Sequence, residues 1–330
     1  MGRGRSYPRS INNAFKTKFL KTIVHFFRLI RWPNLVFILL AEFLFHFCIY
    51  KPLYPNASAL IDKNFYLIGV TYILIAAAGY IINDYFDINI DQVNKPTRVV
   101  VGSFISRRWV IFWHLLFSLL GIYISTIAFP FKQYWHIHLG NLATILLLWF
   151  YSTNFKKDFL IGNVVISLLT AWSIAVVYFS KYTVQEITHP SVSDVANFRF
   201  AKLMIFYCAF AFILTLVREA LKDMEDLEGD EKFGCKTLPI VWGLKPTKIY
   251  ISVWLVVVIT CLAIIQLYVI PFGFWYVIVY SVAFIIIPLA LVLYKLGKSY
   301  TSKDFNLLST YVKVAMFAGI LSMMFFYFLL

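Results

Sequence analysis

Long runs of apolar residues, separated by short polar stretches, dominate this chain of 330 residues. A helix needs roughly 20 apolar residues to cross about 30 Å of hydrocarbon. Nine runs approach that length, near residues 33–50, 64–83, 108–129, 137–152, 161–180, 201–221, 249–270, 272–294 and 309–329. The pattern predicts an all-α, polytopic membrane protein with nine transmembrane helices.

The amino-terminal part of the chain has a different pattern. Residues 1–12 are polar and basic, and between Phe15 and Phe27 apolar residues recur at helical spacing opposite a face rich in lysine. This predicts a cytosolic tail and an amphipathic helix on the membrane surface over residues 1–27, followed by a transmembrane domain over 28–330. A plain positively charged tail is the alternative.

Composition supports the membrane assignment and excludes several other classes. The chain is 61% hydrophobic and 14% charged, with a mean hydropathy of +0.77, which is too apolar for a soluble domain. Its four cysteines form no CxxC pair, so neither a zinc site nor a disulfide framework is indicated. The net charge of +14 comes from residues that flank the apolar runs, which argues against a nucleic-acid partner.

The distribution of lysine and arginine predicts the orientation. If the amino terminus is cytosolic, 23 of the 30 basic residues fall on the cytosolic side. This is the bias that the positive-inside rule describes. We therefore expect a multi-pass protein of the cytoplasmic (inner) cell membrane with its amino terminus in the cytosol.

Acidic residues are concentrated in two short windows that share one spacing. Ten of the 16 acidic residues lie between positions 84 and 91 or between 219 and 231. The first window holds Asn83, Asp84, Asp87 and Asp91, and the second holds Asp223, Asp226 and Asp230. On a continuous helix, each set of acids would share one face. Both windows follow a span that runs toward the cytosol, so we expect the two sets to face each other there.

Like charges at this spacing destabilise a helix, so the carboxylates need positive partners. Nearby lysine and arginine side chains, or solvation of a helix end, are the ordinary explanation. Two matched sets of oxygen ligands favour Mg²⁺, which prefers such ligands and commonly binds together with a phosphate group. Basic residues on the same side are suited to holding a diphosphate leaving group: Lys95, Arg98, Lys156, Lys157, Arg218 and Lys222. A divalent-cation transport site is the alternative of another class.

The two windows resemble the signatures of the UbiA superfamily of intramembrane prenyltransferases. The family pattern NDxxDxxxD stands here as Asn83-Asp84-x-x-Asp87-x-x-x-Asp91, and DxxDxxxD stands as Asp223-x-x-Asp226-x-x-x-Asp230. The likeness extends over nearly the whole chain, including Arg31-Trp32-Pro33-Asn34, Tyr151-Ser152-x-x-Phe155-Lys156-Lys157, Gly162-Asn163 and Arg218-Glu219.

The resemblance implies nine transmembrane helices around a central cavity and two Mg²⁺ ions bound with a prenyl diphosphate. The implied metal ligands are Asn83, Asp84, Asp87, Asp91, Asp223, Asp226 and Asp230. The implied diphosphate-binding residues are Asn34, Lys95, Arg98, Tyr151, Lys156, Lys157 and Lys222. Among these, the residues expected to take part in catalysis are Asp87, Asp91, Asp223, Asp230 and Lys156. The implied reaction transfers the prenyl group to a lipophilic acceptor within the bilayer.

The residues in and around the two motifs are most similar to those of the branch of the family that makes archaeal-type ether lipids. Members of that branch transfer geranylgeranyl to geranylgeranylglyceryl phosphate. One stretch departs from the branch, because Val99-Val100-Val101-Gly102-Ser103 replaces its usual Pro-Ile-Pro-Ser-Gly-like run. An aromatic acid of quinone biosynthesis (hydroxybenzoate, dihydroxynaphthoate or homogentisate) therefore stays open as the acceptor. Glu42 and Lys313, which are ionisable residues within predicted spans, are further candidates for function.

Overall fold

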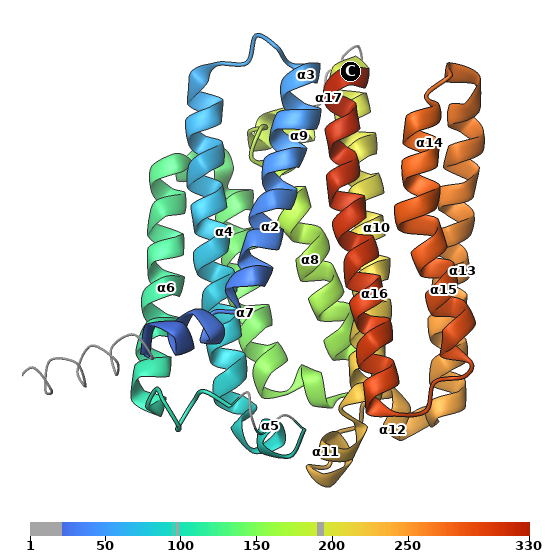
Figure 1. Cartoon of the computed structure of the whole chain (residues 1–330). Helices are drawn as coiled ribbons and strands as arrows, with labels where there is room; N and C mark the ends of the chain where they lie inside the picture. Colours follow the sequence, from blue (N-terminus) through green and yellow to red (C-terminus); the bar gives the residue numbers. More distant parts are fainter. Residues whose placement is uncertain (1–21, 95, 97–98, 190–194) are drawn as a thin grey trace, which may run out of the picture.

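A computed structural model of the chain describes residues 22–94, 96, 99–189 and 195–330. In these residues the chain forms a bundle of helices whose axes run roughly alongside one another (Figure 1), and a single bridge between Val101 and Ile105 is the only β pairing. The elements in chain order are α2 (Trp32–Leu44), η1 (Phe45–Tyr50), α3 (Lys51–Leu53), α4 (Ala59–Phe86), α5 (Ile88–Asn94), α6 (Arg107–Ala128), α7 (Phe131–Thr153), η3 (Phe155–Lys157), α8 (Ile161–Phe179), α9 (Val184–Thr188), α10 (Val195–Glu225), α11 (Leu227–Lys232), α12 (Leu238–Trp242), α13 (Leu244–Val269), η4 (Ile270–Phe272), α14 (Trp275–Ser281), η5 (Val282–Ile286), α15 (Ile287–Leu296), α16 (Ser302–Leu321), η6 (Ser322–Phe325) and α17 (Phe326–Leu329).

Among the described residues, eight helical segments are long and apolar enough to cross a membrane. They are 32–53, 59–86, 107–128, 161–179, 195–225, 244–272, 275–296 and 302–329. The polytopic all-α fold is thus as predicted. The remaining predicted span corresponds to α7, which has 23 residues but carries Gln133, His136, His138 and Asn141, so that its composition is too polar for the same assignment. A total of nine spans stays a prediction.

Two of the long segments contain π-helical turns, and both turns precede a proline. The turn η1 contains Cys48, four residues before Pro52, and η5 contains Phe284, four residues before Pro288. Proline has no N–H to donate, and its ring clashes with the carbonyl four residues earlier. A wider turn accommodates the ring and lets the segment continue across the membrane.

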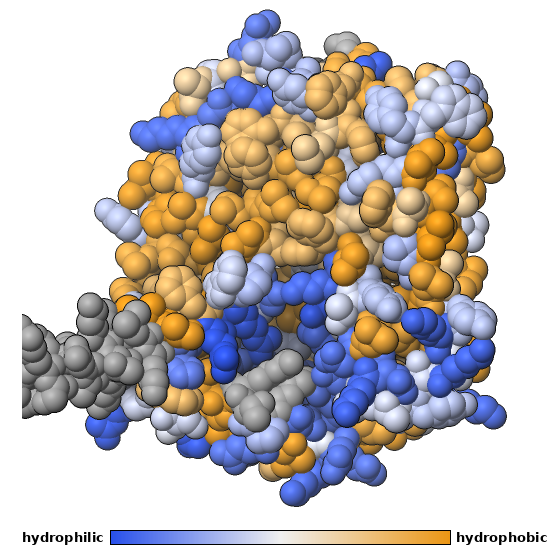
Figure 2. All heavy atoms as spheres, viewed as in Figure 1, coloured by the Kyte–Doolittle hydropathy of each residue, from blue (hydrophilic) through white to orange (hydrophobic). Residues whose placement is uncertain are grey.

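Two large clusters of buried apolar side chains fill the bundle, and a smaller third cluster surrounds Ile81 and Val110. Of the two large clusters, one surrounds Phe45, Phe65 and Phe200, and the other surrounds Leu214 and Leu289. Helix α10 contributes to both large clusters, and it packs against α8 and α16. Many other large apolar side chains are exposed on the flank, where Figure 2 shows a broad apolar band. Such a surface is expected for a protein surrounded by lipid.

The bundle has two chemically different ends. The short helices α5, α11 and α12 lie at one end, and α3, α9 and α17 lie at the other (Figure 1). We call the end with α5 and α11 the motif face, because the acidic windows lie there, and the other end the opposite face. Hydrophilic side chains gather around a hollow at the motif face (Figure 2).

Candidate active site

The first acidic motif lies where α4 leaves the bundle. Helix α4 ends at Phe86, Asp87 has φ −88° and ψ −3°, and α5 begins at Ile88. The backbone N–H of Asp87 still donates to Asn83 O at 3.0 Å, and that of Asp91 donates to Asp87 O at 2.8 Å. The chain therefore bends at Asp87 without losing helical hydrogen bonds, and α5 turns across the motif face.

The second motif bends at the corresponding residue. Helix α10 ends at Glu225, Asp226 has φ −96° and ψ 9°, and α11 begins at Leu227. The N–H of Asp226 donates to Lys222 O at 2.8 Å, and that of Asp230 donates to Asp226 O at 3.1 Å. The expectation of one continuous helical face for each motif is thus wrong. Repulsion between acids three and four residues apart disfavours a straight helix, and a bend at the middle acid separates the outer two.

The bends bring the two motifs together. The backbone N–H of Gly229 in α11 donates to Asn94 Oδ1 in α5 at 2.9 Å. A Cβ atom at Gly229 would overlap the Asn94 carboxamide, so a larger residue at this position could keep the contact only if that side chain moved. Segments 135 residues apart in sequence therefore meet at the motif face, as the sequence predicts.

Cationic and amide groups engage the carboxylates of the first motif. Arg31 Nη2 lies 2.7 Å from Asp84 Oδ1, and the Lys156 ammonium pairs with Asp87. Asn83 Nδ2 donates to Asp87 Oδ2 at 2.7 Å. Burial opposes the charge on Arg31, but the carboxylate of Asp84 and the phenol of Tyr80 outweigh it and raise the pKa of the guanidinium above its ordinary value.

The second motif has a similar arrangement. Asn163 Nδ2 donates to Asp223 Oδ2 at 2.8 Å. Glu219, which is buried one turn earlier, accepts from Lys222 Nζ at 2.8 Å and from Arg218 Nη1 at 3.1 Å. In both motifs an acid is thus paired with a base at the boundary between the bilayer and the polar face, where an unpaired charge is costly.

The donor set fits Mg²⁺. In residues 22–94, 96, 99–189 and 195–330, no three His, Cys, Asp or Glu side chains converge as a ready-made metal cage. Magnesium does not require such a cage, since it keeps several waters and takes one or two carboxylates together with substrate phosphates. The buried Asn83 Oδ1 has no hydrogen-bond partner among the residues that the structure describes, although its amide nitrogen holds Asp87 in place. It is an oxygen ligand of the kind that Mg²⁺ binds.

A central cavity of about 220 Å³ extends from this polar region into the bundle. Its polar end is formed by Arg31, Asn83, Glu219 and Lys222, and apolar residues follow deeper in the bundle, among them Phe37, Ile38, Leu169 and Met316. Such a shape suits a molecule with a charged head and an apolar tail.

The predicted site residues are distributed unevenly around this cavity. Asn34, Asn83, Tyr151 and Lys222 line it. Asp84, Asp87 and Lys156 are positioned by the ion pairs above, and Asp223 by its bond from Asn163. Lys157 contributes a backbone oxygen, which accepts from Lys236 N at 2.6 Å. Lys95 and Arg98 lie outside the described residues, and Asp91, Asp226 and Asp230 lie in or beside α5 and α11.

Cys235 lies beside the second motif. The Cys235 N–H donates to Asp230 O at 2.9 Å. Burial, assisted by the charge of Asp230, raises the pKa of the thiol to about 11, although the charges of Lys157 and Lys156 oppose this shift. The thiol therefore stays protonated at neutral pH, and a nucleophilic role for it is disfavoured.

Sequence reasoning left Arg31 and Asn163 out of the site set. Their partners lie 53 and 60 residues away in sequence, so local spacing carries no signal for these contacts. The two intramembrane candidates do not pair with each other. Lys313 Nζ donates to Asn34 Oδ1 at 3.0 Å, whereas neither carboxylate oxygen of Glu42 has a hydrogen-bond partner in the described part of the chain.

The fold and this site define the class of protein. A helical bundle within the membrane, with paired acidic motifs at the polar end of a cavity, is the architecture of intramembrane prenyltransferases. The model of the UbiA prenyltransferase family matches residues 35–328, and the chain belongs to this family.

Several curated relatives of the chain carry the same name. The chain is 34% identical over 188 residues to the digeranylgeranylglyceryl phosphate synthase of Methanothermobacter thermautotrophicus, covering 56% of this chain and 58% of the relative. It is 32% identical over 247 residues to the synthase of the same name from Methanobrevibacter smithii, covering 73% of this chain and 78% of the relative. The alignment thus spans little more than half the length of the first of these relatives.

Solved structures support the fold. A UbiA homologue from Archaeoglobus fulgidus bound to DMAPP and Mg²⁺ superposes with a TM-score of 0.54 at 19% identity, covering 90% of this chain and 99% of the other. A UbiA homologue from Aeropyrum pernix gives 0.58 at 14% identity, covering 87% and 97%. At these low sequence identities, the structural similarity supports the fold alone.

Proposed function

We propose that the protein is a Mg²⁺-dependent prenyltransferase that moves a polyprenyl group from a prenyl diphosphate to a lipophilic acceptor. The observation that carries this proposal is the meeting of both acidic motifs at the polar end of a cavity whose other end is apolar. Family membership points in the same direction. We place the motif face in the cytosol, because most basic residues flank that end.

The roles of the polar residues follow from their chemistry. Asn83, Asp84, Asp87, Asp91, Asp223, Asp226 and Asp230 are the proposed Mg²⁺ ligands, for two ions. Bound Mg²⁺ neutralises the diphosphate and makes it a better leaving group. Asn34, Lys95, Arg98, Tyr151, Lys156, Lys157 and Lys222 are proposed to hold the diphosphate. The ion pair between Lys156 and Asp87 keeps a cation beside the acids, ready to meet phosphate oxygens.

The reaction balances as a substitution at carbon. The bond between the allylic carbon and the diphosphate oxygen breaks, and its electron pair leaves with the diphosphate. A hydroxyl oxygen of the acceptor forms the new bond to that carbon and releases its proton at the polar end of the cavity. The cations around the departing diphosphate stabilise the charge that develops on it.

For the acceptor we propose geranylgeranylglyceryl phosphate, with geranylgeranyl diphosphate as donor. The support is the shared name of the curated relatives, digeranylgeranylglyceryl phosphate synthase. An aromatic acid is the second candidate, because residues 99–103 depart from the pattern typical of the ether-lipid branch.

The test is an assay with purified protein, Mg²⁺ and geranylgeranyl diphosphate. The glycerol phosphate acceptor and the aromatic acids are supplied in separate reactions, and products are identified by mass. We expect the ether-linked product, and we expect Asp87→Ala and Asp223→Ala to abolish it while the proteins still insert into membranes. Glu231→Gln is the matched control, because Glu231 is exposed and lies outside the motif spacing.

Normal transfer by both alanine variants would refute the site. A product with aromatic acids alone would refute the ether-lipid acceptor and leave prenyl transfer intact. Uptake of Mg²⁺ into proteoliposomes, with no product from any acceptor, would favour the cation transporter instead.

A further inference from the structure

A second cavity, of about 510 Å³, lies toward the opposite face between α10, α13, α14 and α16 with its continuation η6. It shares no lining residue with the central cavity. Its volume is within the range of ligand-binding pockets. Because the helices at its walls are membrane spans, any occupant comes from the bilayer or from the solution at the opposite face.

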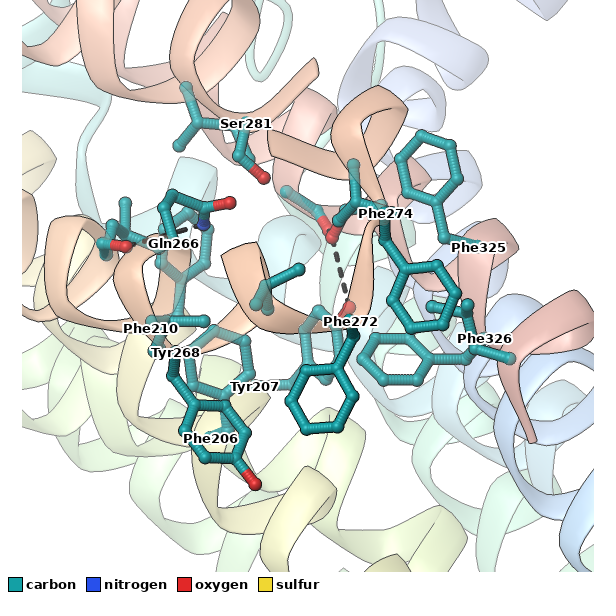
Figure 3. A pocket seen from close by; sticks show the side chains of 18 of the residues that line it. Phe206, Tyr207, Phe210, Gln266, Tyr268, Phe272, Phe274, Ser281, Phe325 and Phe326 are labelled. Atoms are coloured by element: carbon teal, nitrogen blue, oxygen red, sulfur yellow. Dashed lines mark hydrogen bonds between the residues drawn. The ribbon is translucent and has the colours of Figure 1, made fainter. Parts of the chain in front are cut away.

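The walls of this second cavity are largely aromatic. Figure 3 shows Phe206, Phe210, Phe272, Phe325 and Phe326 around it. Part of its shape depends on Gly319 in α16, because a Cβ there would lie 2.4 Å from Phe210 Cε1. The ring of Phe210 therefore packs against the backbone of α16. Such walls suit a flexible hydrocarbon chain.

One polar side chain inside the cavity is only partly hydrogen-bonded. Gln266 is 8% exposed, and its Nε2 donates to Leu262 O at a long 3.4 Å, whereas its buried Oε1 has no hydrogen bond to any described residue. Ser281 is 7% exposed and lines the same space (Figure 3). A buried acceptor without a hydrogen bond destabilises the folded protein, and more so within a bilayer, where water does not reach it. A donor group on a bound molecule would supply the hydrogen bond that Gln266 Oε1 lacks.

A cation stands at the rim. Arg199 lines the cavity, is exposed, and has no carboxylate within 4.0 Å among the described residues. It is the fifth residue of α10, and Phe210 lies eleven residues deeper along the same helix, which is about 16 Å at 1.5 Å per residue. The cavity thus runs from a positive rim to an aromatic interior.

We propose that this second cavity binds one anionic glycerophospholipid from the leaflet at the opposite face. Its phosphate pairs with Arg199, a hydroxyl of its headgroup donates to Gln266 Oε1, and one hydrocarbon chain lies between Phe206 and Phe210. Arg199 and Gln266 lie within five residues of the ends of α10 and α13 at the opposite face, where a headgroup would lie, whereas Phe206 and Phe210 lie deeper along α10, where a hydrocarbon chain would lie. The site is separate from the proposed prenyl transfer and does not depend on it.

The test is native mass spectrometry of the protein released from detergent with equal amounts of phosphatidylglycerol and phosphatidylcholine. We expect one molecule of phosphatidylglycerol to be retained in preference to phosphatidylcholine. Arg199→Ala should lower this retention about tenfold, the effect of losing one charge-assisted hydrogen bond. Lys202→Ala is the matched control, because Lys202 is an exposed cation on the same helix that does not line the cavity.

Two further variants separate the parts of the site. Gln266→Leu keeps the volume but removes the acceptor, so it should lower the preference for phosphatidylglycerol while a lipid chain still binds. Gly319→Ala should push the Phe210 ring into the cavity and reduce retention of both lipids. Equal retention by Arg199→Ala and Lys202→Ala would overturn the proposal, and so would displacement of the lipid by inorganic phosphate alone or equal retention of both lipids.

Discussion

Arg31 has a backbone conformation that residues other than glycine rarely adopt, with φ 50° and ψ 50°. This left-handed region costs about 1–3 kcal/mol for such a residue. The same residue caps the start of α2, pairs with Asp84 at 2.7 Å and lies 5.1 Å from the centre of the Tyr80 ring. A strained backbone is thus combined with a side chain that holds an acid of the first motif.

Arg31→Gly should separate the two effects. Glycine relieves the backbone strain but leaves Asp84 without its cation, so we expect transfer activity to fall roughly 10- to 100-fold, as for other groups that orient a metal ligand. The measurement is kcat/KM as a function of Mg²⁺ concentration. Arg28→Ala is the control, since Arg28 is exposed one turn earlier. Undiminished activity of Arg31→Gly would contradict a positioning role.

Lys181, just beyond the end of α8, is a half-buried cation at the opposite face. Its ammonium lies 4.7 Å from the centre of the Tyr50 ring and 5.4 Å from that of Phe65. Burial lowers its pKa to about 7, although Asp62 opposes the shift and Lys51 adds to it. Between pH 7 and the ordinary lysine value, the unfolded state therefore binds more protons than the folded state does.

This difference predicts that the stability contribution of Lys181 rises with pH above about 7 and is lost as pH falls toward 7. We expect the thermal midpoint in detergent to rise between pH 7 and pH 8.5. Lys181→Met should flatten that rise, and Lys132→Met, which changes an exposed lysine near the same face, should not. An identical pH profile for wild type and Lys181→Met would reject this assignment.

At the scale of elements, the contact between α5 and α11 connects the two motifs. It depends on one hydrogen bond of 2.9 Å and on the absence of a side chain at Gly229. Because each short helix begins directly after the bent acid of its motif, their contact sets the relative position of the acids. A substitution at Gly229 should therefore change the relative position of the acids.

Gly229→Ala should displace the Asn94 carboxamide, which the new methyl would overlap, and so break the hydrogen bond that joins α5 to α11. We expect a loss of activity of about tenfold or more, with the protein still inserted, as for misplaced catalytic groups. Asn94→Ala loses the hydrogen bond without a clash and should be milder. The double variant should recover part of the activity, and if it is no better than Gly229→Ala alone, the steric explanation fails.

The long elements were largely predictable from sequence. Eight predicted spans correspond to long apolar helices, because burial of apolar side chains in lipid produces a strong signal along the chain. Helix α7 gave a weaker signal, since it carries polar residues within a membrane-length helix. The bends at Asp87 and Asp226 were not predicted, because helical spacing alone does not reveal where charge repulsion interrupts a helix.

The candidate site was predictable only where the chain repeats a local pattern. Asn83 came from motif spacing and Lys222 from its position as a basic residue beside the second motif, and both line the central cavity. Arg31 and Asn163 reach the acids from distant elements, and such contacts depend on how the helices pack. The second cavity could not be predicted from the sequence either. Gln266 is a single polar residue with apolar neighbours in α13, and it belongs to no recognisable motif.

At the scale of the whole molecule, the basic residues that flank the motif face predict a cytosolic position for that end. In a variant with serine at the four cysteine positions, Ser302→Cys at the motif face should react with an impermeant thiol reagent only in inverted vesicles. Asn56→Cys, in the exposed loop at the opposite face, should react only in right-side-out vesicles. The reverse pattern would place the site outside the cell.

Ligand binding should stabilise the bundle as a unit, because both motifs and the cavity belong to the same packed helices. At 100 times the dissociation constant, a ligand adds about 2.7 kcal/mol. We expect Mg²⁺ and a prenyl diphosphate together to raise the thermal midpoint, EDTA to reverse the increase, and Asp223→Asn to reduce it. An equal increase in wild type and Asp223→Asn would show that binding does not involve this acid.

The central cavity changes from polar to apolar along its length, and this gradient bears on how a water-insoluble molecule reaches it. Each methylene group moved from hydrocarbon into water costs about 0.8 kcal/mol, so extracting even a ten-carbon tail would cost about 8 kcal/mol. A long-chain reactant avoids that cost if its tail passes directly from the bilayer into the apolar part of the cavity while its head stays at the polar end. Delivery and departure then become lateral diffusion within the bilayer, and no soluble carrier is required.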